Sequence, residues 1–106
     1  MASAANDAWK LILTYDINPE VQQEYFKFMI GRYVPVVQSL GLEMTDAYHT
    51  AYGEHPLRLI VFVSPTRAAL DDLLESETFA ALNEQLATYI SGLSFKTVPF
   101  KEEFQF

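Results

Sequence analysis

Residues 57–64 read Leu-Arg-Leu-Ile-Val-Phe-Val-Ser, the most apolar strand-like stretch of this 106-residue chain. An uninterrupted run of branched and aromatic residues of this length is typical of a strand in the middle of a sheet. Just before it, Gly53-Glu54-His55-Pro56 combines a glycine with a proline and predicts a turn. We therefore expect 57–64 to form a hairpin with the preceding strand, 42–52.

The region upstream of this hairpin predicts a strand followed by a helix. Residues 9–17 alternate between apolar and more polar side chains and form the first predicted strand. Asn18-Pro19-Glu20 is a helix start, because asparagine caps free amides and proline suits the first helical position. Apolar residues then recur at helical spacing as far as Gly41, which is expected to end the helix. Pro35 interrupts this pattern and predicts a kink or a break near 31–34.

The region downstream predicts a second helical region and a last strand. Ser64-Pro65 again places a capping residue before a proline, so we expect the helix to open there. Ser76-Glu77-Thr78 indicates a break, with Ser76 as the cap of a restarted segment. Gly92 is expected to end the helix, and 93–100 forms the last strand, in which Pro99 is typical of an edge or a bulge.

The predicted order is strand, helix, strand, strand, helix, strand. Two right-handed crossovers in this order give the ferredoxin-like βαββαβ arrangement, an α+β fold with a four-stranded antiparallel sheet and two helical regions on one face. Residues 9–106 are expected to form this single domain. Residues 1–8 are small and polar, lack the features of a secretory signal and are expected to fray.

Both faces of the predicted sheet are apolar. Parity within the strands suggests one face with Ile12, Ile60, Phe62, Val98 and Phe100, and another with Leu11, Leu13, Leu59, Val61 and Val63. Helices on one side cover only one of these faces, so the other must be buried by something outside the monomer. We expect that partner to be a second copy of the chain, packed sheet against sheet, with Phe104 and Phe106 of the C-terminal tail as a clasp.

Charge and composition exclude several classes of partner. Fourteen acidic residues against seven basic ones give a formal net charge of -7, which repels nucleic acid and anionic membrane surfaces. No apolar run approaches the length of a membrane span. Cysteine is absent and histidine occurs only twice, so no metal site is predicted, and the lack of a phosphate loop or nucleophile elbow predicts no cofactor. A cytoplasmic protein is expected.

Five short segments carry a resemblance to a known superfamily. They are Tyr25-Phe26 to Pro35, the stop at Gly41, residues 48–54, residues 59–63 and residues 76–79. On these segments the chain after Ala8 resembles the dimeric α/β-barrel superfamily, and most of all its NIPSNAP-type and antibiotic-biosynthesis-monooxygenase-type proteins. The resemblance implies a homodimer in which each subunit encloses a small-molecule cavity between sheet and helices. Such relatives often place tryptophan followed by arginine in the second strand, where this chain has Tyr48 and His49.

Three residues are candidates for proton transfer. His49 is a candidate general base because a free imidazole titrates near neutral pH, the phenol of Tyr48 can donate to a developing oxyanion, and Asp16 can accept a proton or orient the histidine. Neighbours on a strand point to opposite faces, so Tyr48 and His49 enter one cavity only if a bulge intervenes. The alternatives are a hydrogen-bonded histidine of intermediate burial, a packed tyrosine, and an aspartate that begins a turn.

The candidate ligand-binding residues combine aromatic rings with hydrogen-bond donors. Arg58 can hold a carboxylate, although a salt bridge to Glu43, Asp46 or Glu54 is its alternative. Trp9 can form the floor of a flat pocket, or it can pack in the core or the dimer interface. The complete set is Tyr15, Tyr48, His49, Tyr52, Arg58 and Trp9.

Three functions agree with these observations. The first is a homodimeric domain that binds a small, partly aromatic molecule. The second is an enzyme similar to the cofactor-independent monooxygenases of the superfamily, acting on a small aromatic or quinone-like substrate through Tyr48, His49 and Asp16. The third is haem binding or degradation through His49.

Overall fold

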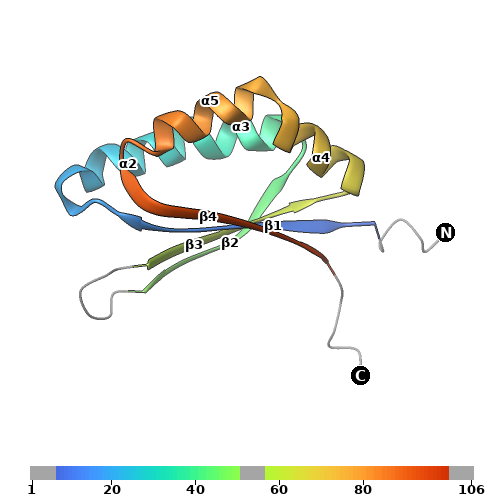
Figure 1. Ribbon diagram of the computed structural model, residues 1–106, viewed down its shortest axis with the longest axis horizontal. Helices are drawn as coiled ribbons and strands as arrows, with labels where there is room; N and C mark the ends of the chain where they lie inside the picture. The colour runs from blue at the N-terminus through green and yellow to red at the C-terminus, as the bar shows by residue number, and fades with distance from the viewer. Residues whose placement is uncertain (1–6, 51–56, 101–106) are drawn as a thin grey trace.

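A four-stranded sheet and a layer of helices make up the computed structural model, which describes residues 7–50 and 57–100 (Figure 1). The sheet order is β2-β3-β1-β4 and every pair of neighbours is antiparallel, which confirms the predicted ferredoxin-like fold. In chain order the elements are β1 (Trp9–Ile17), η1 (Pro19–Val21), α2 (Gln22–Phe28), η2 (Met29–Tyr33), α3 (Val34–Ser39), β2 (Glu43–Thr50), β3 (Leu57–Ser64), α4 (Arg67–Glu75), α5 (Glu77–Leu86) and β4 (Ile90–Pro99).

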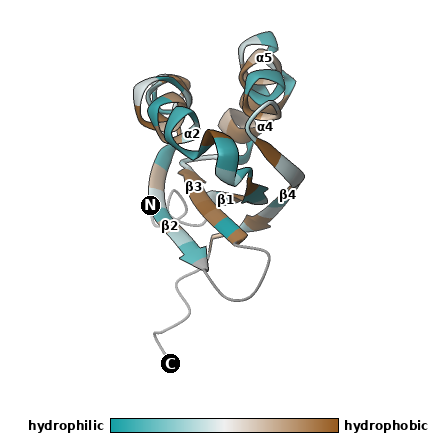
Figure 2. Ribbon diagram, turned by 90° about the vertical axis from the view of Figure 1, so that its left-hand side faces the viewer, coloured by the Kyte–Doolittle hydropathy of each residue, from teal (hydrophilic) through white to brown (hydrophobic). Residues whose placement is uncertain are grey.

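The helices lie on one side of the sheet, as both ribbon views show (Figures 1 and 2). One helical rod runs from α2 through η2 to α3, and a second consists of α4 and α5. We call the side of the sheet beneath these rods the helix-side face and the other side the open face. Among the described residues, no helix has the length and apolar character needed to cross a bilayer.

The strand register decides which side chains reach each face. Leu13 lies opposite Ile60 on the neighbouring strand, and Leu11 lies opposite Phe62, so these four side chains share the helix-side face. The predicted placement of Ile60 and Phe62 on the open face is therefore wrong. Parity fixes the alternation within a strand, but only the pairing between strands relates one strand to the next.

The open face carries the other set of β3 side chains. Val61 lies opposite Ile12, which places Leu59, Val61 and Val63 on this face rather than beneath the helices as predicted. The sequence could not decide this point, because β3 is apolar on both sides; it is brown along most of its length in Figure 2. Both faces of the sheet are apolar, as predicted. The two sets of β3 side chains, however, lie on the opposite faces from those predicted.

The core fills the space between the helix-side face and the helices. Alternate residues of β1 and β3 meet leucines of α4 and α5 and aromatic side chains of the first helical rod. The largest fully buried side chains are Tyr15, Tyr25, Tyr33, Phe62, Leu11, Leu13, Leu42, Ile60, Leu70, Leu73, Leu82 and Leu86.

The first helical rod changes its winding at the predicted irregularity. Residues Met29–Tyr33 form a π-helical turn, and Pro35 lies in the first turn of α3 directly after it. A proline lacks the N–H that a continuous α-helix needs, and a π-turn is a common way for a helix to absorb such an interruption. The rod then ends before Gly41, whose φ of 108° is a conformation that favours glycine.

Two of the five predicted boundaries at caps and glycines shift in the structure. Asn18 and Ser76 accept hydrogen bonds from the backbone amides of Glu20 and Phe79, which confirms both as caps. The cap of α4, however, is Thr66 rather than Ser64. Gly92 was expected to end the helix, but α5 ends at Leu86 and Gly92 lies inside β4 with a φ of 69°.

A bulge lies in β2. Met44 is opposite Phe62 and Asp46 is opposite Val61, so Thr45 is an extra residue on β2. From this point onward the side chains of β2 exchange faces relative to an unbroken strand.

Candidate functional site

A cluster of polar side chains lies at the end of the core where β1 ends and β3 begins. Tyr15 and Arg58 are directly opposite each other on the central pair of strands and both belong to the helix-side face. Tyr25 reaches the same place from α2, and its hydroxyl hydrogen-bonds to that of Tyr15 over 2.5 Å. The two rings meet edge to face with centroids 5.9 Å apart.

Burial controls the protonation of these tyrosines. It is the main reason why the pKa of Tyr15 lies far above its ordinary value, and the neighbouring Tyr25 raises it further. Burial also raises the pKa of Tyr25, although the hydrogen bond shared with Tyr15 and the charge and hydrogen bonding of Arg58 act in the opposite direction. Both hydroxyls are therefore protonated at neutral pH and available as hydrogen-bond donors.

Arg58 is the cation of this cluster. The carbon at the centre of its guanidinium lies 5.6 Å from the centroid of the Phe26 ring, a contact typical of cation–π pairs. Its Nε is buried and has no hydrogen-bond partner among the described residues. The alternative of a salt bridge to Glu43 or Asp46 is wrong, because the pairing places both acidic residues on the open face. Glu54, the third predicted partner, lies outside the described residues.

His49 completes the helix-side face beside Arg58. It lies opposite Arg58 in the β2–β3 pair and its side chain is exposed. The bulge at Thr45 is the cause, since in a strand paired without a bulge from Met44 onward Tyr48 would lie opposite Arg58. His49 is therefore neither packed under a helix nor next to Asp16.

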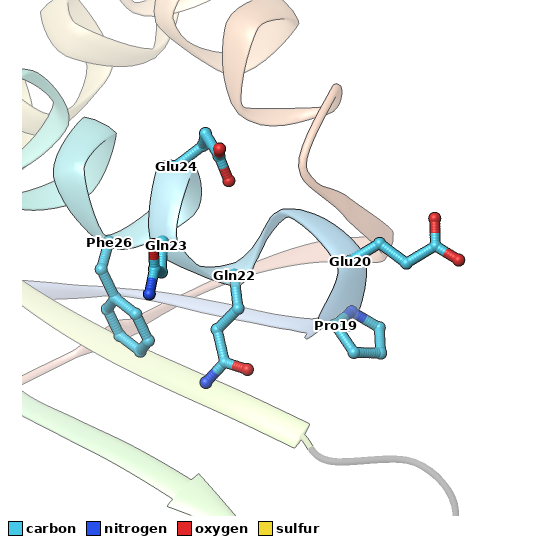
Figure 3. A pocket seen from close by; sticks show the side chains of 6 residues that line it. All are labelled: Pro19, Glu20, Gln22, Gln23, Glu24 and Phe26. Atoms are coloured by element: carbon cyan, nitrogen blue, oxygen red, sulfur yellow. The ribbon is translucent and has the colours of Figure 1, made fainter.

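A surface depression of about 510 Å³ adjoins the cluster at the start of the first helical rod. Figure 3 shows Phe26 and Gln22 pointing from α2 toward the strands, whereas Glu20 and Glu24 point away from them. Phe26 is the link between the two features, because its ring borders the depression and also contacts Arg58.

The other two candidates for proton transfer lie on the open face. Tyr48 is opposite Leu59, is 58% exposed, and donates a hydrogen bond of 3.3 Å to Asp46. Asp16 is opposite Leu57, on β1, and β3 separates it from the strand that carries Tyr48. The structure thus does not bring Tyr48, His49 and Asp16 together.

The remaining ligand-binding candidates do not join the cluster. Trp9 is at the opposite end of β1, six residues or about 20 Å from Tyr15. There its ring lies 4.3 Å from the guanidinium carbon of Arg67, and its side chain packs against the core. Tyr52 lies outside the described residues.

Tyr25 of the cluster and the neighbouring Phe26 were not singled out as site residues in the sequence. Both belong to a helical pattern in which an aromatic residue normally indicates core packing. The signal that could have found them is the pair of aromatic neighbours one turn after the helix start, where a helix passes over the end of the strand before it.

The fold has known relatives in structure. A NIPSNAP family protein from Agrobacterium tumefaciens superposes with a TM-score of 0.67 at 17% identity, covering 94% of this chain and 90% of its own. A proposed antibiotic biosynthesis monooxygenase from Caulobacter crescentus gives 0.69 at 14% identity, with 92% of each chain covered. Hydroxynitrile lyase from Passiflora edulis gives 0.68 at 12% identity, covering 93% of this chain and 98% of its own.

These similarities confirm the suspected resemblance at the level of the fold. No protein-family model and no curated protein matches the sequence. The structural relatives carry names from different functional classes, so the shared fold does not specify a reaction for this chain.

Proposed function

We propose that this protein is a homodimeric domain that binds a small, partly aromatic molecule. The observation that carries the proposal is the polar cluster of Tyr15, Tyr25 and Arg58 at one end of an otherwise apolar core. A few convergent polar groups beside apolar and aromatic surface are the usual composition of a small-molecule site. The exposed His49 and the depression beside Phe26 lie next to this cluster, on the side from which a ligand would enter.

The homodimer is proposed from the open face. Its centre consists of apolar side chains, among them Ile12, Leu59, Val61 and Val63. Leu57 at its margin is 43% exposed in the single chain. Contiguous apolar surface of this kind is usually covered by a partner, and an identical sheet offers a surface of the same size and shape.

Charge at the two sides of the open face favours a second copy as the partner. Glu43 and Asp46 lie on the edge strand β2, and Lys10 and Lys96 lie on β1 and β4 at the other side. A two-fold axis parallel to the strands places the β2 edge of one subunit over the β4 edge of the other. The acidic side of each subunit then faces the basic side of its partner. The clasp by Phe104 and Phe106 stays a prediction, since both lie outside the described residues.

The residues predicted to transfer protons in a monooxygenase-like enzyme do not form one site, because His49 and Asp16 occupy opposite faces of the sheet. Haem binding through His49 rests on a single exposed imidazole. Neither function is favoured by a specific contact, and we therefore propose binding without a reaction.

Native mass spectrometry of the protein taken directly from its expression host tests the binding function and the dimer together. The expected result is a mass of two chains plus a retained small molecule. Light scattering at micromolar concentration provides the control for gas-phase dissociation. A monodisperse monomer in solution contradicts the dimer, and a dimer that neither retains a compound nor binds any member of a fragment library contradicts the binding function.

A further inference from the structure

We propose that the ligand of this site is a small aromatic carboxylate, held by the Arg58 guanidinium and by one hydroxyl of the Tyr15–Tyr25 pair. This inference rests on the proposed binding function and specifies the chemical class of the ligand. Three properties of the cluster support it, namely a surplus of hydrogen-bond donors, a positive charge without a counter-ion among the described residues, and adjacent aromatic surface.

The donors outnumber the acceptors within the cluster. Tyr15 and Tyr25 carry two O–H hydrogens, and their mutual hydrogen bond uses one of them. The hydrogen of the accepting hydroxyl has no acceptor in the described parts of the chain. The buried Nε–H of Arg58 also lacks an acceptor there. Buried donors are nearly always paired, so two unpaired donors at one place indicate that an acceptor group from outside the chain belongs there.

The charge of the cluster specifies what kind of acceptor fits. Arg58 faces Tyr15 on one neighbouring strand and His49 on the other, and both partners are acidic only weakly or not at all. Glu20 and Glu24 border the depression but point away from the strands (Figure 3). A cation whose polar atom is buried, with no counter-ion in the described parts of the chain, favours an anion as the missing acceptor. Guanidinium matches the two oxygens of a carboxylate in particular.

Aromatic side chains next to the cation specify the body of the ligand. The rings of Tyr25 and Phe26 meet edge to face with centroids 4.9 Å apart, and the guanidinium of Arg58 lies beside Phe26. A planar ring attached to the carboxylate can pack against the partly exposed ring of Phe26 while its charge reaches Arg58. An aliphatic carboxylate satisfies the charge but not this surface.

The test is a titration of the ¹⁵N-labelled full chain with sodium benzoate and, separately, with benzamide, its neutral analogue. Calorimetry gives the two affinities, and the Nε–H resonance of Arg58 reports contact with the unpaired donor. Benzoate is expected to bind and to shift that resonance. Benzamide is expected to bind about 10- to 100-fold more weakly, the factor that a hydrogen bond to a charged group supplies.

Variants assign the effect to the cluster. Arg58→Met keeps the length of the side chain without the charge and is expected to weaken benzoate binding by about the same factor. Arg67→Met is the matched control, because it removes one positive charge at the distant Trp9 end of the sheet. The double variant Tyr15→Phe/Tyr25→Phe is expected to weaken binding, whereas Tyr33→Phe, which removes a buried hydroxyl that is bonded to Asn83, is expected to leave binding unchanged.

Several outcomes overturn the inference. Equal affinity for benzoate and benzamide does so, and so does unchanged benzoate binding by a folded Arg58→Met variant. If Glu54→Gln and Arg58→Met destabilise the protein equally and benzoate does not bind, the cation serves an internal ion pair instead. A neutral compound that is retained from the host and binds equally to Arg58→Met leaves the proposed binding function intact but contradicts an anionic ligand.

Discussion

Tyr33 donates a hydrogen bond of 2.7 Å to the side-chain oxygen of Asn83, and this bond connects the π-helical turn of the first rod to α5 in the second. Tyr33 is fully buried and Asn83 is partly buried. The bond thus crosses the layer of helices at the position where the first rod departs from regular α-helical winding.

Loss of this bond should destabilise the fold. Tyr33→Phe removes the donor and leaves the partly buried oxygen of Asn83 without it, so we expect the free energy of unfolding to fall by about 1–2 kcal/mol. Urea denaturation measures the change. A double-mutant cycle with Asn83→Ala isolates the pair, and a coupling energy near zero contradicts the assigned role of the bond.

Stability should decline in alkaline solution. Burial raises the pKa of Tyr15, Tyr25 and Tyr33 above the ordinary value that they regain on unfolding. The folded state therefore binds more protons than the unfolded state once the pH exceeds about 10, and the free energy of unfolding falls as the pH rises further. Below that pH these groups are protonated in both states and contribute no slope.

Urea denaturation between about pH 8 and about pH 11 measures this dependence, and tyrosinate absorbance follows the ionisation. Tyr33→Phe is expected to flatten the decline because one of the three buried groups is gone. If all six tyrosines of the chain ionise together near the ordinary value while the protein stays folded, the buried cluster is misassigned.

A charge on the open face should separate the subunits. Leu59→Glu places a carboxylate in the middle of this apolar face, where a two-fold axis brings it near its own copy. We expect the mass from light scattering to fall from that of two chains to that of one. Ile30→Glu is the matched control, because Ile30 is 74% exposed on the first helical rod, away from the sheet. Equal behaviour of the two variants contradicts the proposed interface.

The caps of the second rod should each contribute to stability. The hydroxyl of Ser76 accepts a hydrogen bond of 3.0 Å from the amide of Phe79, and Thr66 accepts one of 3.0 Å from Ala69. Ser76→Ala and Thr66→Ala are each expected to lower the free energy of unfolding by about 1 kcal/mol. Thermal denaturation at fixed protein concentration measures the loss. An unchanged midpoint in either variant contradicts that cap.

Local signals in the sequence were sufficient for most of the fold. The strands 9–17 and 57–64 were predicted with the bounds that the structure shows, because alternation and an unbroken apolar run are strong local patterns. The predicted end of the last helix at Gly92 was wrong, because α5 already ends at Leu86. A glycine with positive φ suits a helix end and a strand bulge equally well, and only the pairing with β1 distinguishes the two.

The sequence predicted only some of the residues of the candidate site. Tyr15, Arg58 and His49 were named as ligand-binding candidates and the structure places them on one face. The meeting of Tyr15 with Arg58 depends on pairing between strands that are far apart in sequence, and that of His49 with Arg58 depends on the bulge in β2. Asp16 and Tyr48 were grouped with His49 by residue type alone, and the register sends them to the opposite face.

The bulge at Thr45 determines which side chains of β2 face the helices and which lie on the open face. If the strand paired without the bulge from Met44 onward, the phenol of Tyr48 would lie beside Arg58 and the imidazole of His49 would turn toward the open face. Deleting Thr45 itself would remove the bulge and keep His49 opposite Arg58. Two related chains of equal length, one with this bulge and one without it, would therefore expose opposite sets of β2 side chains to ligand and to partner. Aligning their sequences without a gap at this position would equate residues that never occupy the same surface.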